Sequence, residues 1–118
     1  MKKILLVDDS VMQGRILSRI IEESGHQVFE VCDGLIALDL CSIENPQMIF
    51  LDLLMPEMSG QEVLGEIKKS YFHIAVIVRG ADMQKTSREE ITELGGDFFL
   101  NKPIQEEEIL SDLGTYLN

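Results

Sequence analysis

The sequence predicts an α/β fold, a single doubly wound (βα)5 domain around a five-stranded parallel sheet. Short apolar runs alternate five times with segments that have helical periodicity. Several of the apolar runs are continuous, as expected for strands that helices cover on both faces. The 118 residues also suit one hydrophobic core. Right-handed crossovers would then distribute the helices over both faces of the sheet.

Five apolar segments are expected to be the strands. They comprise residues 3–7, 28–31, 48–51, 74–78 and 97–100. The segment 74–78 (IAVIV) is the most apolar, which favours a central or nearly central place in the sheet. The third strand runs directly into Asp52.

The first two helices have clear start and stop signals. Ser10 and Gln13 have the spacing of a capping box, and Gly25 is typical of the residue that follows a helix end. A second helix over 35–43 is expected to stop at Asn45-Pro46, because the residue before a proline disfavours helical backbone angles.

The last three helices are predicted in the same way. Ser59 with Glu62, and Ser87 with Glu90, have the spacing of capping boxes for the third and fourth helices. The last helix is expected to begin after Pro103. Its buried stripe is predicted to comprise Ile109, Leu110, Leu113 and Leu117.

Composition narrows the function. Twenty-one acidic residues face ten basic ones, for a net charge of −11. The absence of a basic patch argues against direct binding of nucleic acid. The excess of acid suits a metal cation or a basic protein surface instead. Cys32 and Cys41 match no zinc or redox spacing, so we expect both to be reduced and partly buried.

The ends of the chain bear on its location. No apolar stretch approaches the roughly 20 residues of a membrane span, and the first residues lack the cleavage site of a signal peptide. We therefore expect a cytoplasmic protein without membrane contact. The domain is expected to span residues 1–118, with no separate output domain.

Charged residues follow three of the predicted strands. Asp8 and Asp9 follow the first strand, Asp52 ends the third, and Lys102 lies just after the fifth. The carboxyl ends of parallel strands meet at one edge, so these residues should converge. Acids at strand ends often serve only as helix caps or solvated charges, but chance seldom places four charged residues in register at one edge.

Three carboxylates in one place predict a bound cation. They repel one another unless a cation intervenes. Oxygen ligands favour hard divalent ions, and Mg²⁺ is the expected one where phosphate is involved. The combination is typical of phosphoryl transfer, in which a carboxylate attacks phosphorus, a metal offsets charge and a lysine holds an oxygen.

Four segments carry a resemblance to a known family. They are LLVDDS at 5–10, FLDLLMPEMSG at 50–60, ADMQ at 81–84 and FFLNKPI at 98–104. The chain resembles, over essentially its whole length, the receiver (CheY-like) domains of two-component signal transduction. The resemblance implies a response regulator with the strand order 2-1-3-4-5.

The family implies a role for each residue of the predicted site. Asp52 would be the phosphoacceptor and Lys102 would contact a phosphoryl oxygen. Asp9 would bind Mg²⁺ directly, Asp8 through water, and Leu54 through its carbonyl. The phosphoryl donor would be a sensor histidine kinase or a phosphotransfer protein.

The family also assigns structural and output roles. Pro56 and Gly60 would shape the loop after the phosphoacceptor, and the peptide bond before Pro103 is expected to be cis. A downstream protein would dock on the face made by the fourth helix, the fifth strand and the fifth helix. That face is acidic on the last helix, which suits a partner of basic character.

The sequence departs from the family at the switch. Gly80 stands where receivers usually carry a threonine or serine, Ala81 takes the small position, and Arg79 replaces an apolar residue. Phe99 takes the aromatic switch position, and the alternative, less favoured, is a plain core residue. The missing hydroxyl removes one hydrogen bond to a charged group, worth about 1.5–3 kcal/mol.

Two functions fit this pattern. In the first, which the retained acids and lysine favour, Asp52 still accepts a phosphoryl group and the response is altered. In the second, the chain is a degenerate receiver that binds partners regardless of phosphorylation. A true enzyme is less well supported, because Leu54 stands where a phosphatase with an aspartate nucleophile commonly has its acid. A flavodoxin-like cofactor protein is also disfavoured, because Asp8 and Asp9 would repel a phosphate.

Overall fold

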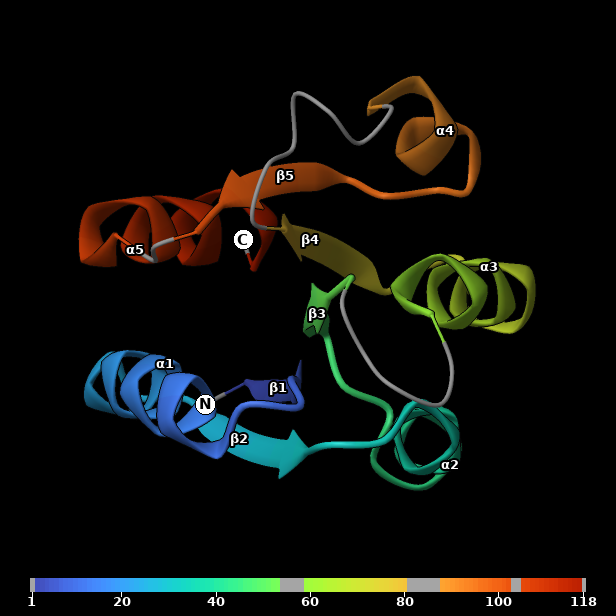
Figure 1. Cartoon of the computed structure of the whole chain (residues 1–118). Coiled ribbons are helices and arrows are strands. Elements are labelled where there is room, and N and C mark those ends of the chain that lie inside the picture. The colour runs from blue at the N-terminus through green and yellow to red at the C-terminus, as the bar shows by residue number, and fades with distance from the viewer. Residues whose placement is uncertain (1, 54–58, 81–87, 103–104, 118) are drawn as a thin grey trace.

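The computed structural model describes residues 2–53, 59–80, 88–102 and 105–117. Within them the strands form one parallel sheet in the order β2-β1-β3-β4-β5, which confirms the predicted fold class and strand order (Figure 1). The strands are β1 (Lys3–Val7), β2 (Gln27–Val31), β3 (Met48–Asp52), β4 (Ala75–Gly80) and β5 (Phe98–Asn101). The helices are α1 (Val11–Glu23), α2 (Gly34–Glu44), α3 (Gly60–Ser70), α4 (Arg88–Glu93) and α5 (Glu106–Tyr116).

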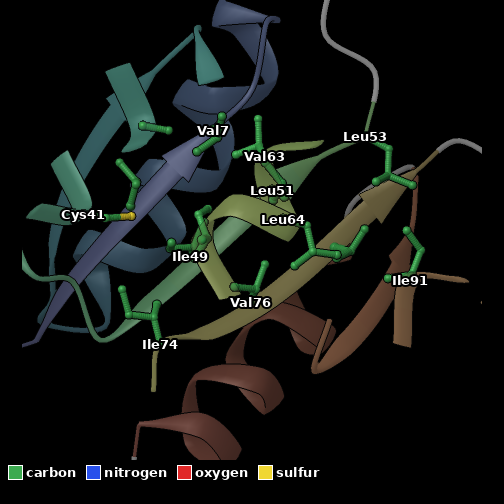
Figure 2. Packing of buried hydrophobic residues seen from close by; sticks show 14 residues of the cluster. Val7, Cys41, Ile49, Leu51, Leu53, Val63, Leu64, Ile74, Val76 and Ile91 are labelled. Atoms are coloured by element: carbon green, nitrogen blue, oxygen red, sulfur yellow. The ribbon is translucent and has the colours of Figure 1, made fainter. Parts of the chain in front are cut away.

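Helices cover the sheet from both sides. Figure 1 shows α1 and α5 on one face, and α2 and α3 on the other. Each face has its own apolar cluster. The cluster beneath α2 and α3 contains Val7, Ile49, Leu51, Val76 and Val78 from the strands (Figure 2). The cluster beneath α1 and α5 contains Ile4, Leu6, Met48, Phe50, Ile77 and Leu100.

The alternation along each strand decides where the charged residues lie. Successive side chains of a strand point to opposite faces, so residues two apart share a face. Phe50 and Ile77 belong to the cluster beneath α1 and α5. Asp52 and Arg79, each two residues further on, therefore lie on that same face, beyond the end of its apolar cluster.

The predicted caps of the first helix are partly confirmed. Ser10 Oγ accepts a hydrogen bond from the backbone N–H of Gln13, at 3.3 Å. The reciprocal bond is not formed, because the N–H of Ser10 donates to Asp8 Oδ1 instead, and Gln13 Oε1 has no partner among the described residues. Gly25 follows the helix with a φ of 92°, and Asn45, after α2, has a φ of 47°. Both therefore take the left-handed conformation typical of helix ends.

Two element predictions need correction. The fourth strand was predicted over residues 74–78, but β4 runs on to Gly80 and so includes Arg79. On α5, Ile109 and Leu113 are buried as predicted, whereas Leu110 is 44% exposed. Leu110 follows Ile109 directly and so points about 100° away from it around the helix, which is too far to share its face.

The two cysteines have different surroundings. Both are free, as predicted. Cys41 is buried on α2, and burial raises the pKa of its thiol to about 11. Cys32 is exposed, so the prediction that both are partly buried was wrong for this residue. Among the described residues, no helix has the length and apolar character needed to cross a membrane.

Candidate functional site

An acidic triad lies at the carboxyl edge of the sheet. Asp8 and Asp9 follow β1, and Asp52 is the last residue of the neighbouring β3. One carboxylate oxygen from each lies within 4.8 Å of the others. Asp52 is completely buried and Asp8 is 4% exposed, whereas Asp9 is exposed. The predicted convergence of the three carboxylates is therefore observed.

Lys102 closes the site from the side of β5. Its Nζ donates a hydrogen bond to Asp52 Oδ2 at 3.0 Å, and its side chain is mostly buried. Its backbone N–H donates to the carbonyl of Gly80, at 2.9 Å, which fixes the lysine relative to the end of β4. The lysine thus offsets charge on the buried carboxylate and stands where it would meet a group attached to that carboxylate.

Arg79 is a second cation of the site, and its place there was not predicted from the sequence. It is the strand partner of Asp52 on β4 and is completely buried. Its Nη2 donates to Asp8 Oδ2. A charged residue on a strand that is buried on both faces requires a nearby counter-charge. The sequence therefore contained a signal for this ion pair: an arginine within an apolar strand, two residues after Ile77 and so on the same face of the sheet.

Asp8 is held at both of its carboxylate oxygens. Oδ1 accepts from the backbone N–H of Ser10, at 2.8 Å, while Oδ2 accepts from Arg79. The first bond turns the chain from β1 into α1, since Ser10 is also the N-cap of that helix. Asp8 is therefore both a member of the triad and part of the turn that positions Asp9.

The described switch and loop positions are placed as follows. Gly80 is buried at the end of β4 and provides no hydroxyl. Phe99 is partly buried against the cluster beneath α2 and α3. Gly60 packs on the end of β3, where an added Cβ would lie 2.5 Å from Leu53 Cα. Four other predicted positions, Leu54, Pro56, Ala81 and Pro103, lie outside the described residues.

The triad fits a small divalent cation. Oxygen ligands about 2.1 Å from Mg²⁺ lie about 3 to 4 Å apart around it, and the three carboxylate oxygens lie within 4.8 Å of one another, which is near this spacing. Carboxylates are also the ligand type that this ion prefers. Asp9 is the member of the triad that is open to solvent.

Comparison with known proteins agrees with this geometry. The family model described as the response regulator receiver domain matches residues 4–113. The polar-differentiation response regulator DivK of Brucella ovis is 31% identical over 118 residues, covering 98% of this chain and 96% of that protein. A similar relative of the same name is found in Brucella anthropi, also at 31% identity and with the same coverage.

Solved receiver structures have the same fold. Vibrio cholerae chemotaxis protein CheY4 superposes with a TM-score of 0.92 at 25% identity, covering 98% of both chains. The receiver domain of a putative LuxO repressor protein from Vibrio parahaemolyticus has a TM-score of 0.88 at 28% identity, covering 98% of this chain and 89% of that one. The chain therefore belongs to the response regulator receiver domains, which are signalling phosphoacceptors served by histidine kinases rather than enzymes in the ordinary sense.

Proposed function

We propose that Asp52 accepts a phosphoryl group from a histidine kinase or phosphotransfer protein, in a reaction supported by Mg²⁺. One observation carries the proposal. The buried Asp52 carboxylate lies within 4.8 Å of two further carboxylates and 3.0 Å from Lys102 Nζ. This set contains a nucleophile, ligands for a divalent cation and a fixed positive charge.

The transfer is a single displacement at phosphorus. An oxygen of Asp52 forms the new bond to phosphorus while the bond from phosphorus to the donor's imidazole nitrogen breaks. The nitrogen keeps the electron pair, and the imidazole takes up a proton if it leaves as the anion. Lys102 holds a phosphoryl oxygen and stabilises the charge that the transferring group spreads over its oxygens.

The metal would be held by the open side of the triad. Asp9 and Asp52 would bind it directly, Asp8 through water, and the carbonyl of Leu54, outside the described residues, would complete the protein ligands. When bound, Mg²⁺ supplies charge neutralisation for the phosphoryl oxygens. The residues themselves orient the acceptor and bury it away from solvent.

The output is proposed to pass to a protein partner through α4, β5 and α5. Both helices present exposed acids on or beside this face, and Phe98 of β5 is also exposed. The exposed acids include Glu89 and Glu93 on α4 and Glu106, Glu107 and Glu108 on α5. A partner with a basic rim and an apolar contact suits such a surface. The proposal implies a cytoplasmic location, because ATP-dependent kinases act there.

A second function, the phosphorylation-independent binding module, is favoured by one observation. Gly80 ends β4 without a side chain, so the hydroxyl that reports phosphorylation in related domains has no equivalent there. In that case the acidic triad would still be present, but the affinity for the partner would not depend on whether Asp52 is phosphorylated.

Intact-protein mass spectrometry tests the proposal directly. The chain is incubated with acetyl phosphate and MgCl₂, and we expect a mass gain of one phosphoryl group. Asp52→Asn should lose the gain, whereas Asp39→Asn, which removes the same charge from an exposed position on α2, should keep it. No gain in the unmodified chain, or a gain that survives Asp52→Asn, would rule out the assignment. If the affinity for a partner were unchanged by acetyl phosphate and by Asp52→Asn, the chain would be the phosphorylation-independent binding module.

A further inference from the structure

We propose that Arg79 acts as a permanent positive charge within the acidic triad. Its guanidinium holds Asp8 in place and weakens the binding of a divalent cation to the triad. This proposal rests on the proposed function and adds to it, because it names the residue that sets the affinity of the site for a divalent cation. It rests on the position of the guanidinium, on its hydrogen bonds and on the balance of charge in the site.

The position of Arg79 leaves its guanidinium no route to solvent. The residue is completely buried, and it is the largest of the fully buried side chains. It is the register partner of Asp52, and its carbonyl accepts a hydrogen bond from the N–H of Leu53 at 3.0 Å. The backbone of β4 therefore holds the arginine next to the end of β3.

The hydrogen bonds of Arg79 are concentrated on the triad. Nη2 donates to Asp8, while Nε and Nη1 are buried without an acceptor among the described residues. A buried arginine with a purely structural task would be expected to use most of its five donors, because unpaired buried donors are costly. The one acceptor that the described residues provide is a carboxylate of the candidate metal site, which indicates that the site uses the charge of the arginine.

The balance of charge follows from these contacts. Three carboxylates with Arg79 and Lys102 give five ionised groups a formal charge of −1, and the same set without Arg79 would have −2. A divalent cation is attracted less strongly to the smaller negative charge and is repelled by the nearby guanidinium. In addition, both carboxylate oxygens of Asp8 already accept hydrogen bonds from the protein, so they are less available to a metal ion.

The consequence is a site that stays assembled without metal. In a site with three close carboxylates and one lysine, mutual repulsion is relieved chiefly by the bound cation. Here Arg79 supplies part of that relief from within the protein. We therefore expect a weaker affinity for Mg²⁺ and less dependence of folding stability on Mg²⁺ than in the same chain without this charge.

A titration with MgCl₂ alone tests the inference, followed by backbone amide NMR shifts and by calorimetry on the full chain. Arg79→Met should bind Mg²⁺ more tightly by about tenfold, since a full charge next to the ion is removed. Its melting temperature should also rise more with added Mg²⁺ than that of the unmodified chain. Arg19→Met is the matched control, because it removes the same charge from an exposed position on α1.

Further variants keep the test decisive if Arg79→Met folds poorly. Arg79→Gln still donates a hydrogen bond but has no charge, so it should also bind Mg²⁺ more tightly, whereas Arg79→Lys should stay within about twofold of the unmodified chain. Equal or weaker binding by both neutral variants would overturn the inference. No phosphodonor is present, so a failure of Asp52 to accept a phosphoryl group would leave this result unchanged.

Discussion

At the scale of single residues, the described part of the chain contains buried charges of two kinds. Asp8 and Arg79 pair with each other at the carboxyl edge of the sheet, where Asp52 pairs with the partly buried Lys102. Asp112 on α5 is different, because it is only 5% exposed and its Oδ2 is buried without a partner among the described residues. Burial, followed by the nearby Glu108, raises the pKa of Asp112 to about 6. This residue therefore costs stability at neutral pH instead of adding to it.

Removal of this charge should stabilise the protein in a defined range of pH. The folded state holds the proton of Asp112 more tightly than the unfolded state does, so stability falls as the pH rises from about 4 to about 6 and stays lower above that. Asp112→Asn should therefore raise the free energy of unfolding at pH 7 by about 1 to 3 kcal/mol. Urea denaturation at pH 4 and at pH 7 measures this.

The control is Asp39→Asn, at an exposed position on α2. Its free energy of unfolding should follow that of the unmodified chain across the same range of pH. If Asp112→Asn gave the same gain at pH 4 as at pH 7, ionisation of Asp112 would not be its cause.

The residue scale also shows what the sequence can and cannot predict about the site. Asp9, Asp52 and Lys102 were predictable because each lies at or just after the end of a strand, and strand ends in a parallel sheet share one edge. The pairing of Arg79 with Asp8 was not predicted, because it joins residues 71 apart and depends on the register of three strands. Arg79 lies beyond the end of the fourth strand as predicted from sequence, so the face to which its side chain points could not be inferred.

At the scale of elements, α3 shows how closely a helix can be fitted to the sheet. Gly60 is the first residue of α3, and its backbone packs directly on the end of β3. A Cβ at this position would lie 2.5 Å from Leu53 Cα and 2.7 Å from the carbonyl oxygen of Asp52. The glycine therefore allows α3 to begin immediately beside the proposed phosphoacceptor.

Two glycine substitutions should have opposite effects. Gly60→Ala should lower the free energy of unfolding by about 1 to 3 kcal/mol, because backbone must move to admit the methyl group. Gly114→Ala, on α5, should raise it by about 0.4 to 1 kcal/mol, since an added Cβ meets nothing within 4 Å there. Urea denaturation of both variants measures the difference. A stabilised Gly60→Ala would contradict the close approach of α3 to β3.

The other end of α3 is fixed by Lys68. Its Nζ donates to Asp97 Oδ2 at 2.8 Å and to the carbonyl of Ile74 at 2.5 Å. Asp97 Oδ2 in turn accepts from the N–H of Val76, at 2.8 Å. One lysine thus connects α3 to the starts of β4 and β5.

Loss of this connection should be measurable. Lys68→Met keeps the apolar stem but removes the ammonium, and should lower the free energy of unfolding by about 1 to 2 kcal/mol. Lys69→Met is the matched control on the same turn, where the side chain is exposed, and should change the value by less than about 0.5 kcal/mol. If both variants lost the same free energy of unfolding, the loss in Lys68→Met could not be attributed to its hydrogen bonds.

At the scale of the whole molecule, the fold was predictable to a large extent. Continuous apolar strands and the alternation of elements follow from local patterns, and the sheet order agreed with the family resemblance. Single boundaries were less predictable. Leu110 is apolar and so was assigned to the core, but it follows the buried Ile109 directly and lies on a different face of α5, where it is exposed.

Because the chain has a net charge of −11, repulsion among its acids lowers the stability of the whole fold and should make the melting temperature depend on salt. Any salt screens the mutual repulsion of the acids, so NaCl should raise the melting temperature modestly. MgCl₂ at equal ionic strength should raise it further, because binding to the folded state adds stability. Asp9→Asn should lose the excess effect of Mg²⁺ and keep the effect of NaCl. Identical curves for the two salts in the unmodified chain would contradict a metal site at the triad.

The contrast between the two cysteines gives this protein a ready position for a reporter group. Cys32 is exposed and lines a hollow together with Asp8, Gly14 and Glu30, whereas Cys41 is buried with a raised thiol pKa of about 11. A maleimide fluorophore should therefore attach to Cys32 alone in the folded protein, with no cysteine removed. Because the chain has no tryptophan, such a label would provide an optical signal beside the acidic triad that the native sequence lacks.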